Sequence, residues 1–279
     1  MIRILTLVFV ALLAACSDRE APQNAKSDGE KTVSTGPAVV VLGGDTSGPF
    51  VDGLRSAGVA NAQASSSENV AERAKLVSSA DVALVLVDAT QGPLPVNRED
   101  VLLARQFCRG PVIIGFARSA SIEDPELLEL EELEMRELLN TYELPGETST
   151  VCFDSEQART KHPKGFPAIA GLLSKLDAVG QAPSSESVQV AEASIYALAD
   201  LESFKQGLVR PIDNGTFRVV FGHQEVDVEI QTGKAIQPAS SGTASIRLSE
   251  PLNLPPGARF VIANQNHVIA AGSVTQIKR

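Results

Sequence analysis

The sequence predicts an α/β domain with a doubly wound parallel sheet, followed by a small antiparallel β-barrel. Residues 38–179 alternate short, continuous apolar runs with stretches of helical period, a pattern typical of buried parallel strands connected by helices. Residues 189–279 instead contain short strands of alternating polarity separated by Gly, Asn and Pro. The segment 180–188 is rich in small and polar residues, which predicts a linker between the two domains.

Apolar runs in the first domain predict strands at 38–42, 82–87, 111–116 and 150–153. Helical periodicity predicts helices at 68–79, 97–107, 126–142 and 165–177. Asp124 is placed as the N-cap of the third helix, with Pro125 at its first position. In the second domain we expect strands at 217–221, 225–230, 244–248, 259–262 and 269–274. Asn214-Gly215 is typical of a hairpin turn.

The order of features in residues 1–15 predicts a cleavable export signal. Arg3 is followed by an apolar run over 4–13 and then by Leu13-Ala14-Ala15-Cys16, which resembles a lipobox. We therefore expect Cys16 to become the lipid-modified N-terminus of a lipoprotein that is anchored to a membrane and faces the periplasm. Ser17 after the cysteine favours the outer over the inner membrane. The alternative is an ordinary exported protein with a spare thiol.

Residues 16–37 contain no Leu, Ile or Phe and are predicted to form a disordered tether, because they have too little apolar surface to build a core. The whole chain has a formal net charge of -10. Removal of Arg3 with the signal leaves 23 basic against 34 acidic residues, or -11. Such a chain repels nucleic acid, so we expect the membrane and an unidentified protein as partners.

Four segments resemble translation elongation factor Tu. They are Asp81 to Gln106 (DVALVLVDATQGPLPVNREDVLLARQ), Pro111 to Pro145 with IEDPELLELEELEMRELLNTYELP, Ala193 to Leu198, and Pro256 to Ile277 (PGARFVIANQNHVIAAGSVTQI). The resemblance implies a GTPase-like sheet domain that contains a P-loop, followed by a barrel similar to the third domain of that family. The family's second domain has no counterpart here, because little more than the linker separates the two parts.

A P-loop needs Gly, four residues, Gly, then Lys for the phosphates and Ser or Thr for magnesium. Gly43, Gly44 and Gly48 resemble the glycine pattern, but Pro49 replaces the Lys and Phe50 replaces the hydroxyl. Proline also removes an N–H group that would face phosphate.

The other nucleotide positions that the resemblance implies are lost as well. An ungapped count back from Asp81 puts the family's Asp-x-x-Gly-His on 62–66, so Ala62 replaces the magnesium carboxylate and Ser66 the catalytic His. The guanine-reading segment falls on Ala117 to Ala120, and the last signature keeps only Ser155. Residues 51–61 leave no room for the first switch region.

These losses remove the charge-stabilising groups that phosphoryl transfer requires. We therefore expect a pseudo-GTPase scaffold that is no enzyme, has no cofactor and acts as a binding protein. The alternative is residual binding of GTP with magnesium, or of another anion, at the glycine turn.

Other chemistry leaves few candidates in this sequence. His162, His223 and His267 lack metal-ligand spacing, and there is no Gly-x-Ser-x-Gly elbow for a nucleophilic Ser. Cys108 and Cys152 fall near the same end of neighbouring predicted strands, so they are either a disulfide or two separate thiols. The acidic helix from Glu123 to Glu137 is either a solvated face or a docking surface for a basic partner.

Overall fold

A computed structural model of the chain describes residues 36–177, 179, 184–198, 211–264 and 266–278. These residues belong to one compact unit, Ser34–Arg279. The expected signal at 1–15, Cys16 and all but the last two residues of the tether lie outside the described residues, as do positions 180–183 of the linker. Among the helices that the structure describes, none is long and apolar enough to cross a membrane.

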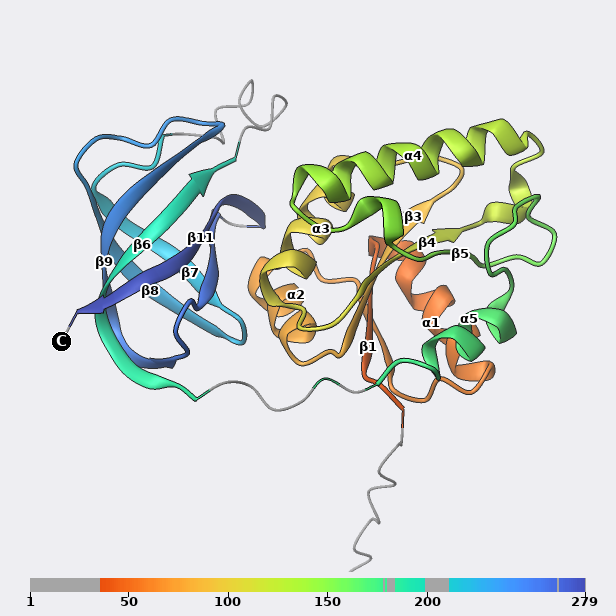
Figure 1. Ribbon diagram of the computed structural model, residues 1–279, viewed down its shortest axis with the longest axis horizontal. Coiled ribbons are helices and arrows are strands. Elements are labelled where there is room, and N and C mark those ends of the chain that lie inside the picture. Colours follow the sequence, from red (N-terminus) through yellow and green to blue (C-terminus); the bar gives the residue numbers. More distant parts are fainter. Residues whose placement is uncertain (1–35, 178, 180–183, 199–210, 265, 279) are drawn as a thin grey trace, which may run out of the picture. The chain divides into compact units, whose positions relative to one another are not determined.

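Within the described residues, five strands form a parallel sheet in the order β2-β1-β3-β4-β5 (Figure 1). The strands are β1 (Val39–Leu42), β2 (Ala62–Ser65), β3 (Val82–Asp88), β4 (Val112–Ala117) and β5 (Val151–Phe153). All seven residues of β3 and all four of β1 are buried, as continuous apolar runs require in a sheet that is covered on both faces. The domain predicted for residues 38–179 is therefore an α/β domain with a parallel sheet.

Helices cover both faces of this sheet. They are α1 (Ser47–Ser56), α2 (Val70–Ser78), α3 (Pro95–Phe107), α4 (Pro125–Thr141) and α5 (Phe166–Leu173). The first and last pack with one face of the sheet, and the middle three pack with the other. Asp124 is the N-cap of α4 and accepts from Glu126 N at 2.9 Å, with Pro125 at the first helical position, as predicted.

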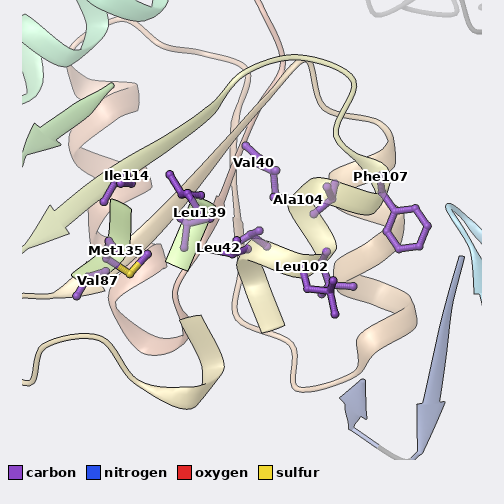
Figure 2. Packing of buried hydrophobic residues seen from close by; sticks show 14 of the residues in the cluster. Val40, Leu42, Val87, Leu102, Ala104, Phe107, Ile114, Met135 and Leu139 are labelled. Atoms are coloured by element: carbon purple, nitrogen blue, oxygen red, sulfur yellow. The ribbon is translucent and has the colours of Figure 1, made fainter. Parts of the chain in front are cut away.

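The face covered by α2, α3 and α4 carries the larger of the two apolar clusters in the sheet domain. Figure 2 shows residues of this cluster, and those that it labels come from β1, β3, β4, α3 and α4. The labelled side chains are Val40, Leu42, Val87, Ile114, Leu102, Ala104, Phe107, Met135 and Leu139. The inner face of α4 consists of Leu128, Met135 and Leu139, which are at most 2% exposed, and partly buried Leu138 and Tyr142 pack against the same cluster.

The described strands of the second domain form a closed antiparallel barrel in the order β10-β11-β6-β9-β8-β7, and pairing of β10 with β7 closes it. The strands are β6 (Glu186–Ala197), β7 (Gly215–Phe221), β8 (Gln224–Thr232), β9 (Ser240–Leu254), β10 (Arg259–Asn264) and β11 (His267–Lys278). In β8, buried Val226, Val228 and Ile230 alternate with exposed acidic residues, which gives the barrel an apolar interior.

Three local features differ from the sequence prediction. Strand β2 was not expected, and β6 begins at Glu186, inside the predicted linker. Asn214-Gly215 is not a hairpin turn, because Gly215 already pairs with Ile230 as the first residue of β7.

The turn of the β7–β8 hairpin lies at the other end of β7, after Phe221. Phe221 pairs with Gln224, so Gly222 and His223 form a two-residue loop. Gly222 has φ 61°, the positive angle that a type II′ turn needs at its first position. Asn214 has another role, because its Oδ1 accepts from Thr232 N at 2.7 Å and ties the start of β7 to the end of β8.

Candidate functional site

The carboxyl ends of the parallel strands are the first place to look for a site, because ligands of open α/β sheets bind in the crevice outside these ends. Here the strands end at Leu42, Ser65, Asp88, Ala117 and Phe153. We call the loops that follow these residues the carboxyl edge. The predicted glycine loop and the predicted base-reading segment both lie at this edge, after β1 and β4.

The glycine loop after β1 is closed by hydrogen bonds within itself. Gly44 to Thr46 form a single 3₁₀ turn, and Ser47 N donates to Gly44 O. The Ser47 hydroxyl donates to the same carbonyl at 2.6 Å, and the Thr46 hydroxyl donates to Gly43 O at 2.8 Å. The hydroxyls of Thr46 and Ser47 and the N–H group of Ser47 therefore donate to carbonyls of the loop itself, so they do not converge on a common anion outside it.

Gly43 is required by its surroundings. Its φ is 154°, and a Cβ there would lie 2.7 Å from Leu86 Cβ and 2.8 Å from Leu86 O. The glycine thus permits β1 and its loop to approach the neighbouring strand β3 closely, which is a packing role.

The two positions after Gly48 have different fates in α1. Pro49 is exposed at the third position of the helix, where a missing N–H group breaks no intrahelical bond. Phe50 is 2% exposed and packs edge to face against Phe166 of α5, with ring centroids 5.2 Å apart. Phe50 is therefore a core residue between α1 and α5.

Charged groups at the centre of the carboxyl edge are paired with one another. Asp88, which ends β3, is 7% exposed and forms an ion pair with Arg118 from the loop after β4. Its Oδ1 accepts from Thr90 N at 3.0 Å and from the Thr90 hydroxyl at 2.7 Å, and its Oδ2 accepts from Gln91 Nε2 at 2.7 Å. This carboxylate is saturated by the chain's own donors.

A second carboxylate, Asp154, fixes the backbone that presents Arg118. Asp154 follows β5, and its two oxygens accept from Arg118 N at 2.7 Å and from Ser119 N at 3.0 Å. The Ser119 hydroxyl also donates to Asp154 at 2.5 Å and accepts from Ser155 N at 3.3 Å. Arg118 has φ 57°, a left-handed conformation that these bonds hold in place.

The predicted positions at the ends of β4 and β5 lie around this network. Ala117 is 5% exposed at the end of β4, Ala120 is exposed within the 3₁₀ turn Ser119–Ser121, and Ser155 joins the Asp154 loop. The sequence analysis did not single out Asp88 or Asp154. Each directly follows an apolar strand run, which is the signal that would have identified it.

The structure does not bring Ala62 to the carboxyl edge. Ala62 is the first residue of β2 and pairs with Val39, the first residue of β1, so it lies at the amino ends of the strands. Ser65 ends β2 and is 2% exposed, and its Oγ has no hydrogen-bond partner within the described residues. Ser66, which follows, is exposed.

Cys108 and Cys152 are free thiols on opposite faces of the sheet, so the disulfide alternative is not realised in this structure. Cys108 packs with the cluster under α2 to α4, whereas Cys152 belongs to the cluster under α1 and α5. Burial raises the pKa of Cys152 to about 12 and also raises that of Cys108. Cys108 is the C-cap of α3 and precedes β4, whereas Cys152 of β5 pairs with Gly115 towards the carboxyl end of β4, so the two residues are not at the same end of the strands.

The comparison with known protein families gives no assignment, because no protein-family model matches this chain.

The chemistry of the carboxyl edge therefore has to be inferred from its two carboxylates, Asp88 and Asp154, and the guanidinium of Arg118. A phosphate that approached Arg118 would compete with Asp88 for the guanidinium and would lie close to that carboxylate. The part of the chain that the structure describes contains no group of three or more His, Cys, Asp or Glu residues able to hold a metal ion. The geometry is that of a structural network that ties three loops together.

The outward side of α4 is the most apolar exposed surface of the sheet domain. Leu130 is 62% exposed, Leu133 is 63% exposed, and Leu127 is 41% exposed. Exposed glutamates of the same helix flank them: Glu126, Glu129, Glu134 and Glu137. The helix that was predicted to be acidic therefore also exposes three leucines on its outward side. Neighbouring exposed leucines are unusual on a surface that contacts only water and favour a docking surface.

Proposed function

We propose that this chain is a lipid-anchored, periplasm-facing envelope protein, with a degenerate elongation factor Tu-like scaffold that binds a protein partner and performs no GTP hydrolysis. The observation that carries the non-catalytic part is the pairing of Asp88 with Arg118 at the carboxyl edge. The pair occupies the predicted base-reading segment with an internally neutralised cation, and this segment also lacks the carboxylate that would bind guanine.

The glycine loop supports the same proposal. The hydroxyls of Thr46 and Ser47 and the amide of Ser47 bond to carbonyls of the loop. Phe50, which follows Pro49, is buried in the core. Binding of GTP with magnesium would therefore require the loop to open, and the chain would still lack a lysine at Pro49 to stabilise the transferred phosphate.

Calorimetry distinguishes this proposal from residual nucleotide binding. The full chain is titrated with GTP and with GDP in the presence of magnesium, with an intact elongation factor Tu as positive control. We expect no binding heat. Specific micromolar binding that is abolished in Arg118→Ala would establish a nucleotide site at the carboxyl edge and overturn the proposal.

The anchor is tested separately, because the proposed lipid attachment at Cys16 rests on the sequence alone. Cells that express the full chain are labelled with a radioactive fatty acid, and Cys16→Ala serves as the matched variant. We expect label in the wild type and none in the variant, with the wild-type protein in the outer-membrane fraction. Equal label in both chains would refute the lipid anchor.

The outward side of α4 is the surface that we propose for the protein partner, which should be basic and amphipathic. Leucines in a setting of glutamates match such a partner in both polarity and charge. The test is co-purification from membranes with wild type and with the double variant Leu130→Asn, Leu133→Asn. Tyr196→Ser alters a 41% exposed side chain of the barrel and serves as control. A partner retained equally by all three chains would exclude this surface.

A further inference from the structure

The contact between the sheet domain and the barrel contains a buried group of charges. Arg73 of α2 is 4% exposed, and its guanidinium bonds to Asp100 of α3 at 2.9 Å and to Glu99 of the same helix at 2.7 Å. From the barrel, His267 of β11 places Nδ1 3.1 Å from the second oxygen of Glu99. The Asn266 carbonyl lies 3.5 Å from the Arg73 guanidinium.

Apolar packing surrounds this group on the barrel side. Val261 of β10 with Val268 and Ala271 of β11 belong to the same buried cluster as the residues of α2 and α3. Gln106 of α3 donates to Phe260 O at 3.0 Å, which adds a hydrogen bond between the domains. Separation of β11 from α2 and α3 would therefore break the contacts that His267 and Asn266 make with this group.

The charges in this group do not balance. Arg73 supplies one positive charge against the two carboxylates of Glu99 and Asp100, which leaves one negative charge in excess among these three side chains. Asp100 is 1% exposed, and its Oδ2 has no hydrogen-bond partner among the residues that the structure describes. A buried charge without full compensation is costly, and one proton on Asp100 removes the excess.

Other charged groups line the cleft at this contact. The cleft at this contact is also lined by acidic Asp45, Glu68, Glu134, Glu137 and Glu143, against basic Arg98, Arg105 and Arg259. Glu68 accepts from the Asn266 amide at 3.4 Å, Arg105 pairs with Glu143, and Arg259 donates to the Arg105 carbonyl. Asp88 of the neighbouring strand β3 is paired with Arg118.

We propose that the contact between the sheet domain and the barrel is a proton-dependent clamp, which takes up a proton at the Arg73, Glu99, Asp100 and His267 cluster as it closes. Mild acid then favours the closed form and neutral pH favours separation of β11 from α2 and α3. The clamp is independent of the proposed pseudo-GTPase function, because it depends only on these interface residues.

The direction follows from Asp100. Burial, the largest cause, raises the pKa of Asp100 from 3.8 to about 6, although Arg73 opposes the shift. The closed form therefore binds more protons than an open form in which Asp100 is in water, and its advantage is lost as the pH rises through about 6.

The size of the effect follows from these two values for Asp100. Between pH 5 and pH 7.5, the ratio of open to closed molecules is expected to rise by about tenfold. Opening is measured in the full chain by thiol labelling of Ala271→Cys, which places a reactive group in the buried contact. The rate at each pH is divided by that of Thr275→Cys, an exposed position of the same strand, which corrects for thiolate chemistry. Peptide-resolved mass spectrometry restricts the readout to the introduced cysteine.

Asp100→Asn separates the clamp from a purely structural contact, since it keeps the shape of the side chain and imitates the protonated acid. In the Ala271→Cys background we expect it to reduce the tenfold pH dependence to less than about threefold. Glu68→Gln, an exposed acid of the same cleft, should keep the full dependence. A wild-type interface with equal corrected rates at pH 5 and pH 7.5 would overturn the clamp, as would full dependence in Asp100→Asn.

Discussion

Replacement of Phe50 by Ala tests whether this position belongs to the core or to a nucleotide loop. Phe50 is 2% exposed in the cluster that contains α1 and α5, and removal of a buried Phe side chain costs about 3–5 kcal/mol of unfolding free energy. The edge-to-face pair with Phe166 contributes about 0.5–1.5 kcal/mol beyond buried area, so we expect the upper half of that range. The loss is a large fraction of the total stability of an ordinary domain.

The assay is urea unfolding followed by circular dichroism, with Pro49→Ala as the neighbouring control. Pro49 is exposed, so its replacement should change the unfolding free energy by less than about 1 kcal/mol. A double-mutant cycle with Phe166→Ala should give a coupling of about 0.5–1.5 kcal/mol. A loss below about 1 kcal/mol for Phe50→Ala would refute the core placement and return Phe50 to the loop.

Three further predictions concern buried polar and titratable groups. Burial, with Glu134 as a smaller cause, raises the pKa of Glu131 to about 7, so stability should fall as the pH rises from about 4.5 through 7. At pH 8, the unfolding free energy of Glu131→Gln in urea should therefore exceed that of the wild type by about 1–3 kcal/mol, and at pH 4 the two should be nearly equal. Glu129→Gln, at an exposed position of the same helix, should match the wild type at both pH values. In alkylation of the native chain at pH 8, mapped by peptide mass, Cys108 should react before Cys152, and a disulfide-linked peptide would contradict the structure. Ser65→Ala should leave the unfolding free energy in urea unchanged or raise it by up to about 2 kcal/mol, because Ser65 Oγ is buried with no partner in the described part of the chain. A decrease of more than about 1 kcal/mol would show that the hydroxyl has a partner.

Most of the fold could be predicted from apolar runs, and the exceptions have physical causes. The run at 82–87 and the run at 111–116 are buried on both faces, so their composition alone identifies β3 and β4. Strand β2 is Ala-Gln-Ala-Ser at the edge of the sheet, and it lacks the β-branched and aromatic residues that indicate a strand. Tertiary pairing with β1, which no local pattern reports, makes it a strand.

The candidate site was predicted less well, because its arrangement depends on where each strand ends. The sequence predicted that the glycines at 43, 44 and 48 follow a strand, and they do follow β1. An ungapped count put Ala62 with them, although it lies at the opposite ends of the strands. The same limit applies to Cys108 and Cys152, since Cys108 ends α3 before β4 begins, whereas Cys152 pairs with Gly115 towards the carboxyl end of β4.

Arg118 links the loops of the carboxyl edge to one another. The segment from Ala117 to Ala120 was selected because it lacks a base-reading carboxylate, yet it contributes the cation that pairs with Asp88. Asp154 fixes the backbone of Arg118 in a left-handed conformation, and the guanidinium then neutralises Asp88. Because the pair is internal, the three loops satisfy one another's charges. A nucleotide could compete only if it compensated both Asp88 and the bonds released in the glycine loop, which supports the proposal of a structural role for this edge and of a partner surface on the outward side of α4.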